Sequence, residues 1–457
     1  MIDMTLGEVA DVVGGRLSGA DPRLRVDAPV EFDSRKARPG GLFLAFPGEH
    51  VDGHSYVGDA LAAGAVAAIV TRPVDGPSIL VSDGHAALAA LAAHVIRRLP
   101  DVFVVGVTGS SGKTSTKDLL AQLLERLGPT VAPPESFNNE LGHPYTVLLS
   151  TVDTKYLVLE TSARGTGHIR YLTEIAPPRI GVVLNVGSAH LGEFGSRAAI
   201  AQAKGELVEA LPADGVAILN ADDPLVATMA SRTAARVVTF GAAGDVSASD
   251  VRLDELSRPR FTLRAGDASA QVAMRLSGEH QVANALAAAA AALECGLPLP
   301  EVADALSQAA PRSKWRMEIT ERPDGVVVIN DAYNANPESM RAALDGLVRI
   351  GSDRRGNTWA VLGPMAELGD SSPAEHEALG RVVADSGIDR LVAVSDASRG
   401  IARGAAGQDG WAGEAEWVPD AEAAITLLRK EVQPGDVVLV KASRAVGLER
   451  VALELVR

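Results

Sequence analysis

Cysteine is almost absent from this chain, and so are long apolar runs and a basic leader. The single Cys295 lies in an alanine-rich helical pattern and cannot form an intramolecular disulfide, so we expect a buried structural thiol rather than a nucleophile. No stretch approaches the roughly 18 uninterrupted apolar residues that cross a bilayer, so we expect no membrane insertion. The first residues, Met1 to Met4, lack the basic and apolar segments of a secretory signal, and we therefore expect a cytoplasmic protein.

Basic residues are also in deficit. The formal charge of −15 argues against a general nucleic-acid binder, because affinity for a phosphate backbone rests on clustered lysine and arginine. Small anions can still bind at local sites, so we expect small-molecule partners. Lysine is much scarcer than arginine, so each lysine inside a motif becomes a candidate functional residue.

The length of the chain predicts several folding units. Its 457 residues are too many for one compact core, while 47% apolar and 22% charged residues are typical of a soluble globular protein. Turn-forming segments at Leu99-Pro100-Asp101 and Ala310-Pro311-Arg312-Ser313 mark the two breaks. We therefore expect three domains, at residues 1–100, 101–312 and 313–457.

Apolar strands alternate with helices in the second and third of these regions, as in parallel sheets covered on both faces. Between residues 242 and 274 short polar and apolar alternation predicts an antiparallel excursion. The predicted strands are 102–107, 156–160, 180–185, 216–219, 326–331, 358–363, 390–395 and 436–441, and the predicted helices are 85–98, 117–127, 197–211, 280–294, 337–350, 373–386 and 420–432. The expected fold class is α/β: a mixed N-terminal domain, a central parallel-sheet domain and a C-terminal Rossmann-like domain.

A phosphate-binding loop follows the first strand of the central domain. Its residues are Thr108-Gly109-Ser110-Ser111-Gly112-Lys113-Thr114-Ser115. Gly109 and Gly112 allow a tight turn that directs backbone N–H groups at phosphate oxygens. Lys113 supplies positive charge, and Thr114 offers Mg²⁺ a hydroxyl. Val107 stands where a longer loop has glycine, but the order of strand, glycine turn and helix is that of a nucleoside-triphosphate site.

Polar side chains follow the strands at the edge where ligands collect in such sheets. Glu160 ends one strand, and Asn185 and His190 follow the next. The carboxylate and the imidazole could complete an Mg²⁺ site beside the loop, or they are a helix cap and a surface histidine. Lys204 lies on a predicted helix, where most lysines are solvated. The segment 220–224 is typical of a turn, although its side chains could also hydrogen-bond a nucleotide.

An unusually polar segment precedes the first long helix of the C-terminal domain. It reads Asn330-Asp331-Ala332-Tyr333-Asn334-Ala335-Asn336-Pro337. Pro337 fits the first helical turn and Asn336 fits its N-cap. Asp331 and Asn334 have no such structural task, so they could accept ribose hydroxyls or orient an amine.

Taken together, these segments resemble the Mur ligases of bacterial cell-wall synthesis along essentially the whole chain, from Asp33 to Arg444. The segments that carry the resemblance are Thr108 to Thr114, Glu135-Ser136-Phe137-Asn138-Asn139-Glu140-Leu141-Gly142, Asn185 to Gly195, Tyr333 to Pro337, Asp33-Ser34-Arg35 and Lys441-Ala442-Ser443-Arg444. The resemblance implies an ATP- and Mg²⁺-dependent ligase that joins D-alanyl-D-alanine to UDP-N-acetylmuramoyl-tripeptide through an acyl phosphate. We expect a monomer whose partners are these small molecules.

The resemblance also implies roles for individual residues. Those implied to bind ATP are Gly109, Ser110, Ser111, Gly112, Lys113, Thr114, Ser115, Asn284, Arg316 and Asp331. Those implied to bind the other substrates are Ser34, Arg35, Asn138, Asn139, Asn334, Lys441, Ser443 and Arg444. The implied metal ligands are Thr114, Glu160, His190 and, if it is carbamylated, Lys204; the implied catalytic residues are Lys113, Lys204, His190 and Glu160. By the same resemblance, the N-terminal domain grips the UDP-sugar and the C-terminal domain contacts the nucleotide and the incoming amine.

Some positions depart from the family pattern and leave the acceptor amine open. They are Thr161-Ser162 after the metal glutamate, Gln281 after His280, Pro364, and Ala442. The alternative is a related ligase with another amine or carboxylate, such as a D-alanyl-D-lactate variant or a natural-product intermediate. An ATP-binding regulator without turnover is disfavoured because Asp331, Lys441 and Arg444 are present. The third residue of the tripeptide, lysine or diaminopimelate, stays open.

Overall fold

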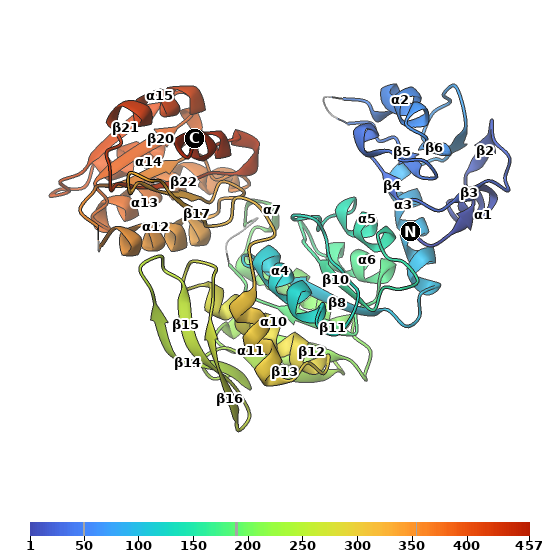
Figure 1. The fold of residues 1–457 in the computed structure, drawn as a ribbon, viewed down its shortest axis with the longest axis horizontal. Helices are drawn as coiled ribbons and strands as arrows, with labels where there is room; N and C mark the ends of the chain where they lie inside the picture. The colour runs from blue at the N-terminus through green and yellow to red at the C-terminus, as the bar shows by residue number, and fades with distance from the viewer. Residues whose placement is uncertain (49–50, 188–190, 353) are drawn as a thin grey trace.

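The computed structural model describes residues 1–48, 51–187, 191–352 and 354–457. Within these residues three large sheets follow one another along the chain, and each lies in a lobe of its own (Figure 1). The N-terminal and C-terminal lobes sit on either side of the central lobe, so the chain ends lie far apart in this view. The expectation of an α/β protein with an N-terminal, a parallel central and a Rossmann-like C-terminal sheet is confirmed.

The N-terminal sheet runs in the order β2-β7-β6-β5-β4, with β2 antiparallel and the other strands parallel. The elements of this lobe are β1 (Met4–Thr5), α1 (Leu6–Val12), β2 (Arg16–Ser18), β3 (Arg25–Val26), β4 (Val30–Glu31), η1 (Ser34–Lys36), β5 (Leu42–Leu44), η2 (Gly53–Tyr56), α2 (Val57–Ala62), β6 (Ala67–Val70), β7 (Ser78–Leu80) and α3 (Gly84–Arg97). Strands β1 and β3 pair with each other in a separate two-stranded sheet. The Asp83 side chain caps α3 by accepting from two backbone N–H groups. The apolar face of α3 shares one core with Leu157 and Leu159 of the central sheet, which joins the two lobes.

The central sheet runs in the order β16-β15-β14-β13-β12-β11-β8-β10-β9. Its strands are β8 (Phe103–Thr108), β9 (Thr130–Val131), β10 (Tyr156–Glu160), β11 (Ile180–Val183), β12 (Val216–Asn220), β13 (Arg236–Phe240), β14 (Val246–Leu253), β15 (Pro259–Ala265) and β16 (Ala268–Ala273). Strand β8 lies between β10 and β11, so the loop after β8 emerges beside the ends of both neighbours. The predicted antiparallel excursion is confirmed, because β14, β15 and β16 pair antiparallel at one edge.

Helices cover both faces of the central sheet. They are α4 (Lys113–Leu124), α5 (Gly142–Leu148), α6 (His168–Ile175), α7 (Leu191–Phe194), α8 (Arg197–Glu209), α9 (Pro224–Ala227), η3 (Thr228–Arg232), α10 (Gln281–Glu294) and α11 (Leu299–Gln308). The alanine-rich face of α10 packs beside α4 over the sheet, since alanine allows a close approach of two helices (Figure 1). Cys295, expected to be buried, is only half-buried because it caps the end of α10; burial still raises its thiol pKa to about 12.

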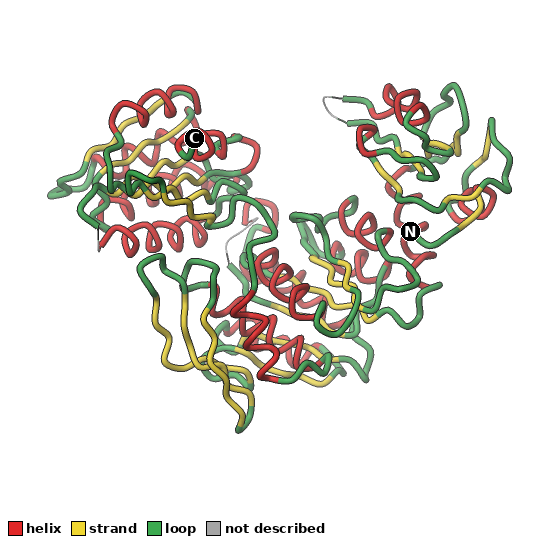
Figure 2. The backbone as a smooth tube through the Cα atoms, in the orientation of Figure 1, coloured by secondary structure: helices red, strands yellow, loops and turns green. Residues whose placement is uncertain are grey.

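The C-terminal sheet runs in the order β17-β18-β22-β19-β20-β21, with β17 antiparallel at the edge. Its elements are β17 (Glu318–Glu321), β18 (Val327–Asn330), α12 (Pro337–Ser352), β19 (Thr358–Leu362), η4 (Gly369–Ser371), α13 (Ser372–Asp385), β20 (Arg390–Val394), η5 (Asp396–Ser398), α14 (Arg399–Ala406), β21 (Glu414–Val418), α15 (Ala421–Glu431), β22 (Val437–Lys441), η6 (Arg444–Val446) and α16 (Glu449–Leu455). Helices α12, α13 and α14 share one core, and α15 and α16 share another. Figure 2 shows helices on both sides of the strands of this lobe. Ligands of such a sheet collect at the carboxyl ends of its strands, where Asp331 and Lys441 lie.

Two differences from the predicted elements matter for the site. Helix α4 begins at Lys113 rather than at residue 117, because Gly112 adopts a left-handed conformation at the N-cap and the Thr114 and Thr116 side chains are buried. Lys113 and Thr114 therefore lie in the first helical turn, where the positive end of the helix dipole adds to the lysine charge. Helices α5, α6 and α11 were not anticipated. Among the described residues, no helix is long and apolar enough to cross a membrane.

Candidate active site

A cavity of about 660 Å³ lies where the central and C-terminal lobes meet. Its wall combines the phosphate loop, the segment after β9, the ends of β10 and β11, the start of α10, and the loops after β18 and β22. The predicted site residues that line it are Ser110, Ser111, Gly112, Lys113, Thr114, Ser115, Asn138, Asn139, Glu160, Asn284, Arg316, Asp331, Asn334, Lys441, Ser443 and Arg444. The tertiary structure therefore brings together residues that are more than 300 positions apart in the chain.

The phosphate loop is held in a tight turn. Gly112 has φ 80°, and a Cβ there would lie 2.4 Å from Asn284 Oδ1, so only glycine fits without displacement. Lys113 Nζ donates to the Gly109 carbonyl at 2.8 Å, which folds the lysine back over the loop. Burial lowers the pKa of Lys113, and the nearby Glu160 carboxylate opposes that shift.

Asn185 has a part in this loop that the sequence did not reveal. Its side-chain Oδ1 accepts from the backbone N–H groups of Ser110 and Ser111 at 2.9 and 3.0 Å. Its Nδ2 donates to the Ser111 carbonyl at 3.2 Å. These loop amides are thus satisfied by an amide oxygen in this conformation rather than pointing freely outward. The only sequence signal was a polar residue following a buried strand.

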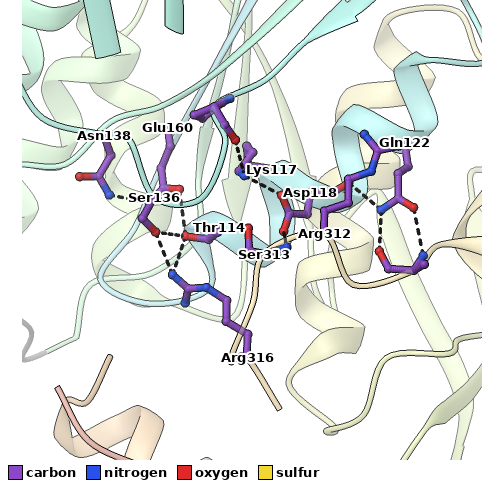
Figure 3. A network of polar contacts seen from close by, with 12 residues as sticks. Thr114, Lys117, Asp118, Gln122, Ser136, Asn138, Glu160, Arg312, Ser313 and Arg316 are labelled. Atoms are coloured by element: carbon purple, nitrogen blue, oxygen red, sulfur yellow. Dashed lines mark hydrogen bonds and ion pairs between the residues drawn. The ribbon is translucent and has the colours of Figure 1, made fainter. Parts of the chain in front are cut away.

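The Thr114 hydroxyl lies at the centre of a polar network (Figure 3). It donates to Glu160 Oε2 at 2.9 Å and lies 2.5 Å from the Ser136 hydroxyl. Because the single proton of Thr114 goes to Glu160, Ser136 donates to Thr114. Asn138 Nδ2 donates to Glu160 Oε1 at 2.7 Å, so both carboxylate oxygens of this buried residue are satisfied. Ser136 was not among the predicted site residues, although it lies in the quoted Glu135 to Gly142 segment.

Arg316 reaches this network from the C-terminal side. Its Nη2 donates to the hydroxyls of Thr114 and Ser136 at 2.9 and 2.8 Å, and its guanidinium lies 4.3 Å from the Tyr333 ring centre. Two lobes thereby contribute to one polar centre. The positive charge of Arg316 stands close to the loop, where a triphosphate would carry its negative charge.

The oxygen donors at this centre fit a hard divalent cation. A threonine hydroxyl and a buried carboxylate are both ligands that Mg²⁺ accepts. Among the described residues no group of three or more His, Cys, Asp or Glu side chains could hold a metal. His190, one of the predicted ligands, lies outside the described residues.

Lys204 lies on α8 behind the loop and is 4% exposed. The alternative of a solvated lysine is therefore wrong. Burial, and secondarily the charge of Lys113, lowers the pKa of Lys204 well below its ordinary value. Lys204 does not line the cavity itself.

The C-terminal wall is built around an ion pair. Lys441 Nζ lies 2.6 Å from Asp331 Oδ2 and donates to the Asn334 carbonyl at 2.8 Å, and Lys441 is 2% exposed. Asp331 Oδ1 accepts from the Met317 N–H at 3.0 Å. Both residues predicted for ligand contact are therefore bound to each other, and Asn334 remains exposed in the cavity.

The end of β22 supplies the other predicted residues of this wall. Ser443 Oγ accepts from the Ala366 N–H at 2.8 Å, which fixes the loop after β19. The Arg444 guanidinium lies 4.3 Å from the Trp315 ring centre and 2.9 Å from Glu449. Arg444 is therefore held in place while its side chain still lines the cavity.

Several predicted residues lie elsewhere or have structural tasks. Ser34 and Arg35 are not part of the cavity wall, and the Arg35 guanidinium makes paired 2.8 Å bonds to Asp33 on the N-terminal lobe. Asn139 lines the cavity, and its Oδ1 also accepts from the Gly142 N–H at the start of α5. The predicted N-cap of α12 is confirmed, because Asn336 Oδ1 accepts from the Ser339 N–H.

The segment 220–224 forms the turn that its composition predicts. Asp223 caps α9 and also accepts from the Val186 N–H at 2.7 Å. Asp222 accepts from the Ala242 N–H. The side chains of this turn therefore serve the backbone, and none of them lines the cavity.

Comparison with known protein families gives three matches along the chain. They are the Mur ligase family catalytic domain at residues 29–96, the Mur ligase middle domain at 107–292, and the Mur ligase glutamate ligase domain at 315–444. Together these matches include the phosphate loop and both sides of the cavity.

Full-length relatives match as well. The chain is 51% identical to the UDP-N-acetylmuramoyl-tripeptide–D-alanyl-D-alanine ligase of Mycobacterium tuberculosis, across 100% of this chain and 98% of that protein. It is 36% identical to the enzyme of that name from Escherichia coli, across 100% and 99%.

Solved structures agree. MurF from Acinetobacter baumannii superimposes with a TM-score of 0.87 at 33% identity, covering 99% of both chains. A MurF ligase from Thermotoga maritima, solved in complex with ADP, superimposes with a TM-score of 0.78 at 31% identity, covering 94% of this chain and 97% of that one.

Proposed function

The chain belongs to the Mur ligase family, and we propose that it joins D-alanyl-D-alanine to UDP-N-acetylmuramoyl-tripeptide at the expense of ATP. The reaction forms an amide bond in peptidoglycan precursor synthesis. The observation that carries the proposal is the bond from Arg316 to Thr114, which itself bonds Glu160, in one cavity between two lobes. A ligase of this kind has to hold ATP on one lobe and close a second lobe over it.

The reaction has two steps. The terminal carboxylate of the tripeptide attacks the γ-phosphorus of ATP, the bond to the bridging oxygen breaks, and ADP leaves as an acyl phosphate forms. The amine of the dipeptide then attacks the acyl carbon, loses a proton, and expels phosphate. An acyl phosphate hydrolyses in water, so the chemistry requires an enclosed site with the reacting atoms about 3 to 3.5 Å apart.

The residues of the central lobe hold the triphosphate. Lys113 and the backbone N–H groups of the first turn of α4 neutralise charge on the phosphates, and the dipole of that helix adds to their effect. Thr114 and Glu160 would hold Mg²⁺, together with Lys204 if it is carbamylated, and His190, which lies outside the described residues, would be a further ligand. Bound Mg²⁺ would neutralise the charge that develops on the transferred phosphoryl group. Asn284 faces the adenine from the start of α10.

The residues of the C-terminal lobe complete the site. Arg316 faces the γ-phosphate, and Asp331, oriented by Lys441, accepts ribose hydroxyls. Ser443 and Arg444, together with Lys441, face the carboxylate of the incoming dipeptide. The N-terminal lobe, with Ser34 and Arg35, grips the UDP-sugar, and Asn138 and Asn139 contact the peptide that runs from there to the cavity.

A substrate panel tests the proposal. Phosphate release is measured with ATP, Mg²⁺ and UDP-N-acetylmuramoyl-tripeptide carrying either lysine or diaminopimelate, each with D-alanyl-D-alanine, D-alanyl-D-lactate or single amino acids. Release that depends on D-alanyl-D-alanine is expected. Release only with a different amine would assign the chain to a related ligase. We also propose that the enzyme acts as a cytoplasmic monomer, which sedimentation at working concentration tests.

A further inference from the structure

The linker that joins the central and C-terminal lobes is attached along the phosphate-loop helix α4 (Figure 3). Gln122 binds both backbone polar groups of Ala310, the first residue of the linker. Its Oε1 accepts from the Ala310 N–H at 3.0 Å, and its Nε2 donates to the Ala310 carbonyl at 3.1 Å. Arg312 forms a solvent-exposed ion pair with Glu125. Asp118 Oδ2 accepts from the Ser313 N–H at 3.0 Å. The linker thus follows the helix toward the phosphate loop.

The Asp118 contact is the buried one of the three. Lys117 Nζ lies 2.6 Å from Asp118 Oδ1 and also donates to the Pro133 carbonyl at 2.8 Å. Lys117 is 1% exposed and Ser313 is 5% exposed, so solvent does not compete for these bonds. A charged acceptor shielded from water makes a stronger hydrogen bond than the exposed Arg312 pair, which salt and water weaken.

The spacing of these contacts sets the reach of Arg316. Asp118 lies one helical turn after Thr114, on the same face of α4. Ser313 lies three residues before Arg316 on the linker. Anchoring Ser313 at Asp118 therefore brings the Arg316 guanidinium back over the preceding turn, where it bonds the Thr114 hydroxyl.

The linker backbone beside Arg316 has an unusual conformation and is hydrogen-bonded on both sides. Trp315 and Met317 have φ 58° and 50°, a left-handed conformation that costs a side-chain-bearing residue energy unless its surroundings hold it. On the C-terminal side the Met317 N–H donates to Asp331, and the Trp315 carbonyl accepts from the Tyr333 N–H at 3.2 Å. On the side of the central lobe, Asp118 fixes the linker by accepting the hydrogen bond from the Ser313 N–H.

We propose that Asp118, supported by Gln122, is a positioning residue of the ligase: it anchors the interlobe linker to the phosphate-loop helix at the point from which Arg316 meets the nucleotide. This rests on the proposed function. Any turning of the C-terminal lobe against the central lobe then takes place after Ser313, and the segment 310–313 moves with α4. Arg316 belongs to the site itself, whereas Asp118 acts through it.

A matched pair of double variants isolates the Ser313 bond. Lys117→Met/Asp118→Asn removes the buried ion pair and keeps an acceptor for the Ser313 N–H. Lys117→Met/Asp118→Leu removes the ion pair and the acceptor together, and uncharged side chains of similar size avoid leaving a lone buried charge. The leucine pair is expected to have a kcat about tenfold below the asparagine pair, the effect of one hydrogen bond of about 1.4 kcal/mol. The KM for the tripeptide substrate should be equal in both.

Arg316→Met introduced into each variant tests whether the anchor acts through Arg316. The leucine and asparagine pairs should then turn over at the same rate, because the group that the anchor positions is gone. Equal kcat for the two pairs with Arg316 present, or the same tenfold difference with Arg316 replaced, would overturn the proposal. The second result would mean that Asp118 only supports the fold.

Two further measurements keep the test decisive. If the leucine pair does not fold, Gln122→Met takes its place, because it removes the two bonds to Ala310 and leaves the Lys117–Asp118 ion pair intact. It should lower kcat when Arg316 is present and leave kcat unchanged when Arg316 is replaced. Arg126→Met is the control, since Arg126 lies just beyond the C-terminal end of α4 and bonds Asp304 and Gln308 rather than the linker. It should leave kcat unchanged.

The dissociation constant of ATP, measured by calorimetry, needs no ligation and should show the same contrast between the leucine and asparagine pairs. A wild-type chain that binds ATP but ligates nothing would refute the proposed function alone. Equal ATP affinities of the two pairs would refute the anchor.

Discussion

The phosphate loop admits one sharp test, the change of Gly112 to alanine. At φ 80° an alanine pays about 1 to 2 kcal/mol for its left-handed conformation. Its Cβ would also lie 2.4 Å from Asn284 Oδ1, so the amide has to move. Asn284 is 6% exposed, and its Nδ2 donates to Gln281 Oε1 at 3.0 Å. Displacing it breaks that bond, which adds about 1 kcal/mol.

The expected total is a loss of about 2 to 3 kcal/mol in the free energy of unfolding. The two contributions separate in a double-mutant cycle with Asn284→Ala, because that variant has no Oδ1 for the new methyl group to meet. In the Asn284→Ala background, Gly112→Ala should cost only the conformational part, about 1 to 2 kcal/mol.

The assay is urea unfolding of the wild type, the two single variants and the double variant, followed by circular dichroism. The informative transition is the one that Gly112→Ala shifts, since a chain of several lobes need not unfold in one step. Equal costs of Gly112→Ala in the two backgrounds would refute the packing of Asn284 against the loop. A cost below about 0.5 kcal/mol would refute the strained geometry as well.

Three other changes have defined outcomes. Lys113→Ala should abolish ATP-dependent phosphate release with both substrates present, because the charge nearest the phosphates is lost; near-normal turnover would contradict the phosphate assignment. Burial lowers the pKa of Lys204, and a lowered pKa increases the share of the neutral amine, which is the form that reacts with carbon dioxide. Wild-type activity should therefore fall in bicarbonate-free buffer and return when bicarbonate is added. A Lys204→Met variant should be inactive in both buffers. Constant wild-type activity across that comparison would argue against carbamylation. Burial raises the pKa of Glu31, which lies beside Tyr145. The protonated carboxyl therefore contributes stability that is fully present below the pKa of about 4.3 in the unfolded chain. That contribution is lost as the pH rises through the higher pKa of Glu31 in the folded protein. Glu31→Gln should therefore stabilise the protein at neutral pH and not in acid, which urea unfolding at both pH values checks; equal stabilisation at the two would show that ionisation is not the cause.

Local patterns predicted most of the sheet and helix order. The strand before the phosphate loop, the alanine-rich helix α10 and the antiparallel β14 to β16 follow from periodicity and turn chemistry that short segments carry by themselves. The start of α4 was misplaced because Thr114 and Thr116 favour loops by composition. They enter the helix because tertiary packing buries them. Helix α11 was missed although Leu299, Val302 and Leu306 recur at helical spacing and are buried in the core of the central lobe.

The sequence by itself determined which residues are available for chemistry: a glycine turn with Lys113 and Thr114, a carboxylate at the end of β10, and a polar loop before α12. These are local arrangements, set by a few neighbouring side chains and backbone preferences. Only the tertiary structure decided their partners. Asn185 on the loop amides, Asp118 on the Ser313 N–H and Arg316 on Thr114 join residues some 75 to 200 positions apart. Such contacts depend on how whole lobes pack and where the linker between them is held, and no short stretch of sequence contains that information.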